Sequence, residues 1–181
     1  MKYVAVIGSV VVFAVLALFV FWRGESAEPR TPVVQNGPIA EGPREIPKGS
    51  REYRNEKYRA SFIYPEDLKV NEFDEGGGAS TIIFQNAEKG RGFQIFVVPY
   101  KEAQVSEEQF KKDIPSGVRN NLEETVIDEV VGATFLSRDM VLGETREVWF
   151  IHGGYLFEIT VPKALDEWLG TIMGTWKFTQ T

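Results

Sequence analysis

The distribution of apolar and polar residues divides the chain into three segments. Residues 3–22 carry no charge and are almost entirely apolar. A helix of that length rises about 30 Å, which matches the thickness of a bilayer's hydrocarbon core. Residues 24–52 show no hydrophobic periodicity and hold five of the nine prolines. From residue 53 to 181, short runs of alternating apolar and polar residues predict a folded domain.

Residues 1–23 are predicted to form an N-terminal transmembrane helix. Trp22 ends the apolar run as an interfacial aromatic residue, and Lys2 and Arg23 flank the run. A cleaved signal peptide is an alternative, but its apolar region would be shorter, and Glu25 stands where a small residue is wanted before the cleavage site. A buried core helix is a third alternative. For an uncleaved anchor, the slight charge bias favours a single-pass protein of the cell membrane with a cytoplasmic N-terminus and an extracytoplasmic C-terminal domain.

Residues 24–52 are predicted to form a flexible, proline-rich linker. Acidic and basic residues alternate irregularly in this segment, and few apolar side chains interrupt them. Such a segment cannot bury enough surface to offset the entropy that ordering would cost. A spacer between the membrane and the domain is therefore expected.

The domain is predicted to consist mostly of strands. Beyond the hairpin discussed next, β-type runs occupy residues 58–65, 68–73, 80–86, 92–100, 124–131 and 133–142, with Gly132 as the break between the last two. Two helices are predicted. The helix over 105–114 begins with a capping box in which Ser106 is the N-cap and Gln109 stands three positions on. The helix over 163–176 has an apolar stripe, and a short strand within 175–180 follows it.

Residues 146–162 are predicted to form a β-hairpin that contains the only histidine of the chain. Gly153 and Gly154 suit a two-residue turn, because both central positions need a positive φ. Moving the turn to His152–Gly153 would place Glu147 opposite Glu158, a destabilising like-charge pair. His152 is therefore predicted to precede the turn. The predicted register pairs Ile151 with Leu156, Phe150 with Phe157, Trp149 with Glu158, Val148 with Ile159, and Glu147 with Thr160.

The composition excludes catalytic sites that depend on cysteine and argues against those that depend on histidine. Without cysteine the chain has no disulfide, thiolate metal site or cysteine nucleophile. A Ser–His pair would have to use His152, and no serine is marked by its context. The domain holds 14 basic and 21 acidic residues, a net charge of −7, which argues against nucleic acid as a partner. Neither an enzyme nor a cofactor is predicted.

Two groups of residues are candidate binding sites. Glu72, Asp74 and Glu75 precede three glycines, and carboxylates in a flexible loop suit a weakly bound cation such as calcium. The spacing of a dedicated calcium loop is absent, so a mobile acidic loop is the other interpretation. Trp149 falls on the more polar face of the predicted hairpin, where either the C-terminal helix covers it or it contacts a partner. His152 is a second candidate for partner contact.

Three stretches of the domain resemble the PsbP-like family: "KYRASFIYPEDLKV" (57–70), "EVWFIHGGYLFEIT" (147–160) and "MGTWKF" (173–178). That family is named for an extrinsic subunit of photosystem II and includes small bacterial envelope proteins. The resemblance implies an α+β domain in which an antiparallel sheet is flanked by helices, as an α/β/α sandwich. It also implies a non-enzymatic domain that docks on other proteins. The tryptophan that is common after "YP" is replaced by Leu68, and metal-binding histidines are not carried over because only His152 exists.

The sequence thus predicts a membrane-anchored, extracytoplasmic module that binds or assembles envelope proteins without catalytic activity. The alternative is an envelope domain that binds a small ligand or a calcium-like metal ion, with or without hydrolytic activity, through the acidic residues near 72–75.

Overall fold

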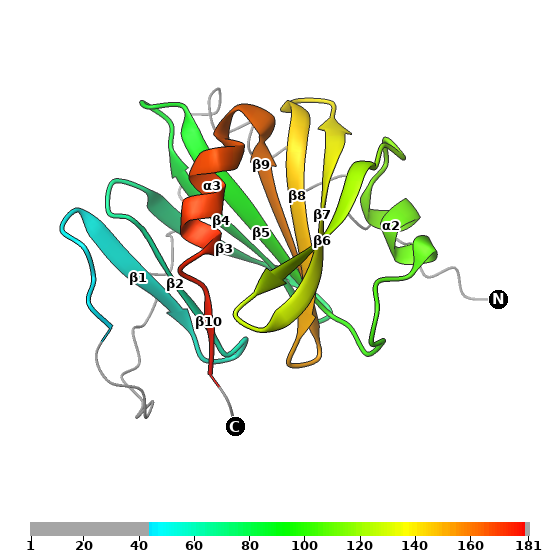
Figure 1. Ribbon diagram of the computed structural model, residues 1–181, viewed down its shortest axis with the longest axis horizontal. Helices are drawn as coiled ribbons and strands as arrows, with labels where there is room; N and C mark the ends of the chain where they lie inside the picture. The colour runs from blue at the N-terminus through cyan, green and yellow to red at the C-terminus, as the bar shows by residue number, and fades with distance from the viewer. Residues whose placement is uncertain (1–43, 180–181) are drawn as a thin grey trace.

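A computed structural model describes residues 44–179, which form two antiparallel sheets and two short α-helices (Figure 1). The strands are β1 (Ser50–Asn55), β2 (Ala60–Pro65), β3 (Lys69–Gly76), β4 (Ala79–Asn86), β5 (Arg91–Pro99), β6 (Asn120–Ile127), β7 (Val130–Asp139), β8 (Gly143–His152), β9 (Tyr155–Pro162) and β10 (Lys177–Phe178). The helices are α2 (Glu107–Asp113) and α3 (Asp166–Met173), and a 3-10 turn, η1 (Lys163–Leu165), leads into α3.

The predicted transmembrane helix, residues 1–23, lies outside the described residues, as does most of the predicted linker. Within residues 44–179, no helix has both the length and the apolar character needed to cross a membrane. Strand β1 begins at Ser50, so the folded domain starts inside the segment predicted to be a linker.

The seven-stranded sheet, called here the large sheet, has the strand order β3-β4-β5-β9-β8-β7-β6, and the small sheet has the order β1-β2-β10. Every pairing between these strands is antiparallel. The prediction of an antiparallel fold with flanking helices is confirmed. The small sheet was not predicted as a separate layer, because the first half of its edge strand β1 lies in the segment predicted to be a linker.

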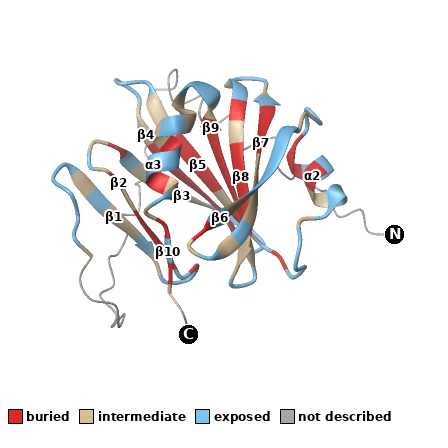
Figure 2. Ribbon diagram, in the orientation of Figure 1, coloured by how far each residue is buried: buried red, intermediate tan, exposed pale blue. Residues whose placement is uncertain are grey.

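The main apolar core lies between the large sheet on one side and α3 with the small sheet on the other, so this face is called the α3 side. Figure 2 shows the buried residues concentrated on the central strands of the large sheet. Aromatic rings join the layers: Phe62 of β2 meets Phe84 of β4 at 5.2 Å, and Trp176 beside β10 meets Phe150 of β8 at 5.4 Å. Rings of this size dominate the energetics of a core because each removes a large apolar area from water. The predicted stripe of the C-terminal helix is confirmed, since Leu169 and Ile172 are buried in this core.

Helix α2 packs on the opposite face of the large sheet, called the α2 side. The Ser106 hydroxyl accepts a hydrogen bond from the Gln109 backbone N–H at 3.0 Å, which confirms the predicted N-cap. The return bond of the capping box does not form. The Gln109 amide donates to Asp113 instead, and the Ser106 N–H donates to the Tyr100 hydroxyl at 3.1 Å.

The predicted β8–β9 hairpin is confirmed in every residue pair, including Trp149 with Glu158 and Glu147 with Thr160. Gly153 and Gly154 have φ values of 59° and 83°, as the two-residue turn requires. His152 pairs with Tyr155 directly before this turn.

The predicted break at Gly132 is wrong. The β6–β7 turn lies at Asp128 and Glu129, whose φ values are 44° and 70°. The Asp128 carboxylate stabilises this turn because it accepts the Phe178 N–H at 2.8 Å and pairs with Lys177. Gly132 instead lies inside β7, where a Cβ atom would stand 2.7 Å from the Trp149 carbonyl oxygen. Its lack of a side chain therefore serves close packing between strands rather than a turn.

Candidate functional site

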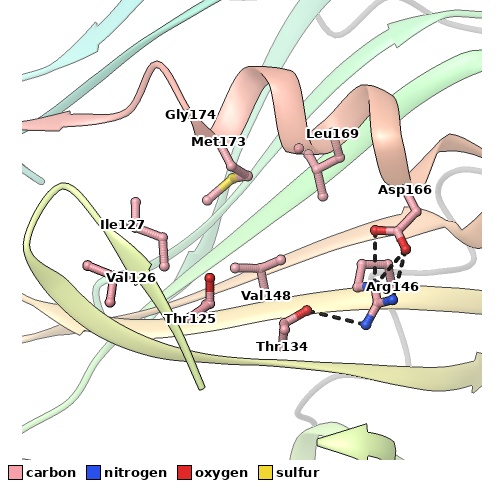
Figure 3. A pocket seen from close by; sticks show the side chains of 11 residues that line it. Thr125, Val126, Ile127, Thr134, Arg146, Val148, Asp166, Leu169, Met173 and Gly174 are labelled. Carbon is pink, nitrogen blue, oxygen red and sulfur yellow. Dashed lines mark hydrogen bonds and ion pairs between the residues drawn. The ribbon is translucent and has the colours of Figure 1, made fainter. Parts of the chain in front are cut away.

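A groove of about 330 Å³ lies between helix α3 and the part of the large sheet formed by β6, β7 and β8 (Figure 3). Its apolar lining comes from both walls. Ile127 and Val148 contribute from the sheet, and Leu169 and Met173 contribute from α3. The volume is at the small end of the range for ligand pockets, which suits a few side chains of a partner better than a large cofactor.

Gly170 contributes to the width of the groove. It lies within α3, it is exposed, and an added Cβ atom would meet nothing within 4 Å. Glycine inside a helix costs about 1 kcal/mol relative to alanine. The helix therefore carries a residue that weakens it at a point where a larger side chain would fit and would extend into the groove.

An ion pair closes one end of the groove. The Arg146 Nε atom donates to both carboxylate oxygens of Asp166 at 3.0 Å, and Nη2 donates to Oδ2 at 2.8 Å. A further nitrogen, Nη1, lies 3.4 Å from the Thr134 hydroxyl. Asp166 is in the first turn of α3 and Arg146 is on β8, so the pair fixes the start of the helix over the sheet. Because the two charges are paired with each other, this end of the groove carries little net charge.

The other side of the groove borders a free sheet edge. Strand β6 is an outermost strand of the large sheet, with β7 on one side and no described strand on the other. Leu122, Val126 and Val131 are 52%, 63% and 60% exposed on this hairpin. A sheet edge with unpaired backbone groups next to apolar side chains is a template for pairing with another chain.

The arrangement of this domain is similar to that of a solved structure. The solution structure of cyanobacterial PsbP (CyanoP) from Synechocystis sp. PCC 6803 superposes with a TM-score of 0.51 over 77% of this chain and 98% of that chain, at 15% sequence identity. The domain has the PsbP-like fold. At this identity the likeness concerns the fold alone. No protein-family model and no curated protein matches the sequence.

Within the PsbP-like domain, Trp149 is not a surface contact, which corrects that prediction. Its side chain is 1% exposed, and its ring stacks on Phe110 of α2 at 4.8 Å and meets Phe135 at 5.5 Å. The sequence placed Trp149 correctly on the more polar face of the hairpin. That face is covered by α2 rather than by the C-terminal helix, because α3 lies on the other side of the large sheet.

His152 has a packing role in the PsbP-like domain. Its ring is half-buried and stacks on Phe178 of β10 at 4.0 Å, so it connects the β8–β9 turn with the small sheet. Burial lowers the pKa of this imidazole, and the nearby Arg59 charge acts in the same direction. Contact of His152 with a partner stays a prediction.

The predicted cation loop is largely a strand. Glu72, Asp74 and Glu75 lie in β3, and Asp74 accepts the Gly76 N–H at 2.9 Å. Across residues 44–179, no three side chains of histidine, cysteine, aspartate or glutamate are placed so that they could hold a metal ion together. In β3 these carboxylates do not form such a group, and weak cation binding by them stays a prediction.

The sequence did not predict the buried carboxyl groups on the α2 side. Glu147 is 3% exposed and accepts hydrogen bonds from the hydroxyls of Thr145 at 2.7 Å and Thr160 at 2.6 Å. Burial raises the pKa of Glu147 to about 7, although these hydroxyl bonds oppose the rise. Glu158 is 6% exposed, and burial together with the neighbouring Asp113 raises its pKa well above its ordinary value. These groups lie on the face opposite the groove, so they belong to the interior and not to the candidate site.

Proposed function

We propose that this chain is a non-catalytic protein-binding module, held outside the cytoplasmic membrane by its N-terminal apolar segment. The observation that carries the proposal is the groove between α3 and the free edge strand β6. Half of the six large apolar side chains exposed in residues 44–179 lie on the β6–β7 hairpin, whose strand β6 forms one wall of the groove. Clustered apolar exposure of this kind marks interaction surfaces in soluble domains.

The chemistry around the groove favours binding over catalysis. Its charged groups, Arg146 and Asp166, are engaged with each other, and the lining is otherwise apolar or neutral. The single imidazole, His152, stacks on Phe178 rather than standing beside a nucleophile. The PsbP-like fold is consistent with an extrinsic binding domain, and no observation favours the metal-binding or hydrolytic alternative.

Support for the location comes from the sequence. The uncharged run 3–22 is long enough to span a bilayer. The proline-rich segment after it would hold the domain tens of ångströms from the membrane surface, at roughly 3 Å per residue when extended. A domain tethered in this way could reach a membrane-embedded or soluble partner.

Photo-crosslinking tests the binding site. A photoreactive amino acid replaces Val126 beside the groove or, as a control, Val141 in the turn between β7 and β8; these valines are 63% and 53% exposed. In membranes of the native host, position 126 is expected to give discrete crosslinked products that position 141 does not give. Equal capture at both positions, or none at position 126, would contradict the proposed site.

Protease protection and mass analysis test the location. The membrane fraction is expected to contain the uncleaved 20.4 kDa chain, and protease added to the outside of intact spheroplasts is expected to digest the domain. A shortened product that lacks the apolar run would show that this run is a cleaved signal peptide and not an anchor. A domain that is digested only after lysis would place it in the cytoplasm.

A further inference from the structure

We propose that the partner presents a basic, extended segment that adds to β6 as an extra strand of the large sheet and inserts alternate apolar side chains into the groove. This inference rests on the protein-binding function proposed above and names the kind of partner.

The β6–β7 turn determines which backbone groups of β6 are free. In a two-residue hairpin, the residues that flank the turn, here Ile127 and Val130, form a hydrogen-bonded pair, and pairs then alternate along the ladder. Thr125 is therefore bonded to β7, whereas Val126 and Glu124 direct their N–H and C=O groups away from it. These two residues provide two donors and two acceptors for an incoming strand.

The groove lies where the side chains of that strand would point. A strand paired with β6 runs about 4.8 Å from it, and its alternate side chains face the α3 side of the sheet. On that side they would extend β6's row of Thr125 and Ile127 towards Leu169 and Met173 of α3. Main-chain bonds would then provide affinity, and the groove would select the alternate side chains, as in other cases of strand addition.

Charge defines the partner further. Glu123, Glu124 and Glu129 are exposed on the β6–β7 hairpin, and none of the ion pairs within residues 44–179 includes them. Three cations close to this hairpin are already engaged: Arg146 with Asp166, Lys177 with Asp128, and Arg119 with Glu107. The edge therefore has uncompensated negative charge, which lysine or arginine residues of an incoming strand would neutralise.

The same charge disfavours a second copy of this chain as the occupant. Two β6 strands paired with each other would bring Glu123 and Glu124 of both chains close together, and a pair centred on Glu124 would place its two copies directly opposite each other. Like charges directly opposite each other destabilise a strand pair, and charged edges are a common protection against self-association.

Hydrogen–deuterium exchange with synthetic peptides tests the inference. The full chain, in a mild non-ionic detergent, is mixed with a capped peptide of about six residues that alternates valine and lysine, a usual strand length. The matched peptide has glutamate in place of lysine. The valine–lysine peptide is expected to slow amide exchange in residues 120–127, and the valine–glutamate peptide is expected to leave it unchanged.

Two variants distinguish strand addition from nonspecific binding of the peptide. Val126→Pro removes an outward N–H without removing a β6–β7 bond, so peptide affinity is expected to fall about tenfold or more. Gly170→Leu is expected to weaken binding as well, because the new side chain fills the groove while it favours the helix. The proline control is Glu88→Pro, an exposed position in the β4–β5 turn, where peptide binding is expected to stay within about twofold because that turn is remote from β6. Unchanged melting temperatures show that each variant is folded.

Each possible result either supports strand addition at β6 or overturns it. Protection of β6 by the basic peptide, lost in both variants, supports strand addition. No protection, equal binding of the acidic peptide, or protection of β6 by self-association without any peptide would each overturn it. If partner capture at position 126 persists in such a case, the binding function stands and only strand addition is refuted; if that capture also fails, the proposed function fails with it.

Discussion

The buried carboxyl of Glu147 makes the stability of the domain depend on pH in an unusual direction. A carboxyl whose pKa is raised by folding is neutral in the folded state at pH values where the unfolded chain would ionise it. Its contribution to stability is complete below the unfolded pKa and is lost as the pH rises through the folded pKa. For Glu147 that window runs from its ordinary value of 4.5 to about 7.

The size of the effect follows from the same two values. A rise in the Glu147 pKa from 4.5 to about 7 corresponds to a loss of about 3 kcal/mol in the free energy of unfolding across the window. Glu158 acts in the same direction, because its pKa is also raised. The lowered pKa values of Asp67, Glu107 and Asp128 affect stability only at more acidic pH, below their ordinary range. His152 opposes Glu147 below about pH 6.5, because its pKa is lowered and acid would force a charge into a half-buried site.

Because several groups titrate, the informative quantity is the difference between wild type and Glu147→Gln at each pH. Urea unfolding of the full chain, followed by tryptophan fluorescence, gives the free energy of unfolding from about pH 4.5 to 8.5. Relative to Glu147→Gln, the wild type is expected to lose about 3 kcal/mol across this range. Glu102→Gln, at an exposed position, is the control and should follow the wild type. A constant difference between wild type and Glu147→Gln, or one that grows in favour of the wild type as the pH rises, would refute the reasoning.

Three further predictions concern individual residues of the fold. Gly132→Ala should destabilise the domain by about 1–3 kcal/mol in urea unfolding, because its new methyl group would stand 2.7 Å from the Trp149 carbonyl oxygen; an unchanged midpoint would contradict this. Ser106→Ala should cost about 1 kcal/mol in the same assay by removing the acceptor of the Gln109 N–H, and Ser106→Thr should restore most of the loss. Millimolar calcium, manganese or zinc should leave the melting temperature unchanged, because the acidic residues 72–75 of β3 do not form a group that could hold a metal ion; a rise that is lost in Asp74→Asn would show a cation site there.

The elements that the sequence predicted well are those decided by neighbours along the chain. The turn at Gly153–Gly154 follows from the need for two positive φ values, and the exclusion of a Glu147–Glu158 pair selected the register. The start of α2 follows from Ser106 and Gln109 in the same local way. Each of these decisions compares alternatives a few residues apart, so no knowledge of distant packing is needed.

The β6–β7 hairpin was missed because its turn breaks the usual residue preference. Positive φ at two consecutive residues normally indicates glycine or asparagine, whereas Asp128 and Glu129 occupy this turn. What stabilises Asp128 there comes from β10, about fifty residues along the chain, through Lys177 and the Phe178 N–H. Because the turn was not recognised, the sequence could not show that β6 is a free edge or that a groove lies beside it.

The helix that packs over Trp149 could not be predicted, because that packing also depends on a contact between distant parts of the chain. Alternation along the predicted hairpin placed Trp149, Glu147 and Thr160 on one face, but alternation does not say which helix packs on that face. The α2 helix decides it through Phe110, which stacks on the indole. The buried carboxyls on the same face are equally invisible to the sequence, because glutamate in a strand usually faces solvent.

The two faces of the large sheet pack against the cores, whereas its free edge at β6 forms part of the candidate site. Stability and binding can therefore be tested separately. Aromatic residues that join the layers, such as Phe62 of β2 and Phe84 of β4, are fully buried and lie on strands that do not neighbour β6. The outward backbone groups of Val126 and Glu124 take no part in the β6–β7 ladder. Removing them should therefore change binding much more than stability, whereas a substitution in the aromatic core should reduce both together. A β6 variant that loses partner binding while its unfolding midpoint is unchanged would locate the function at the sheet edge itself.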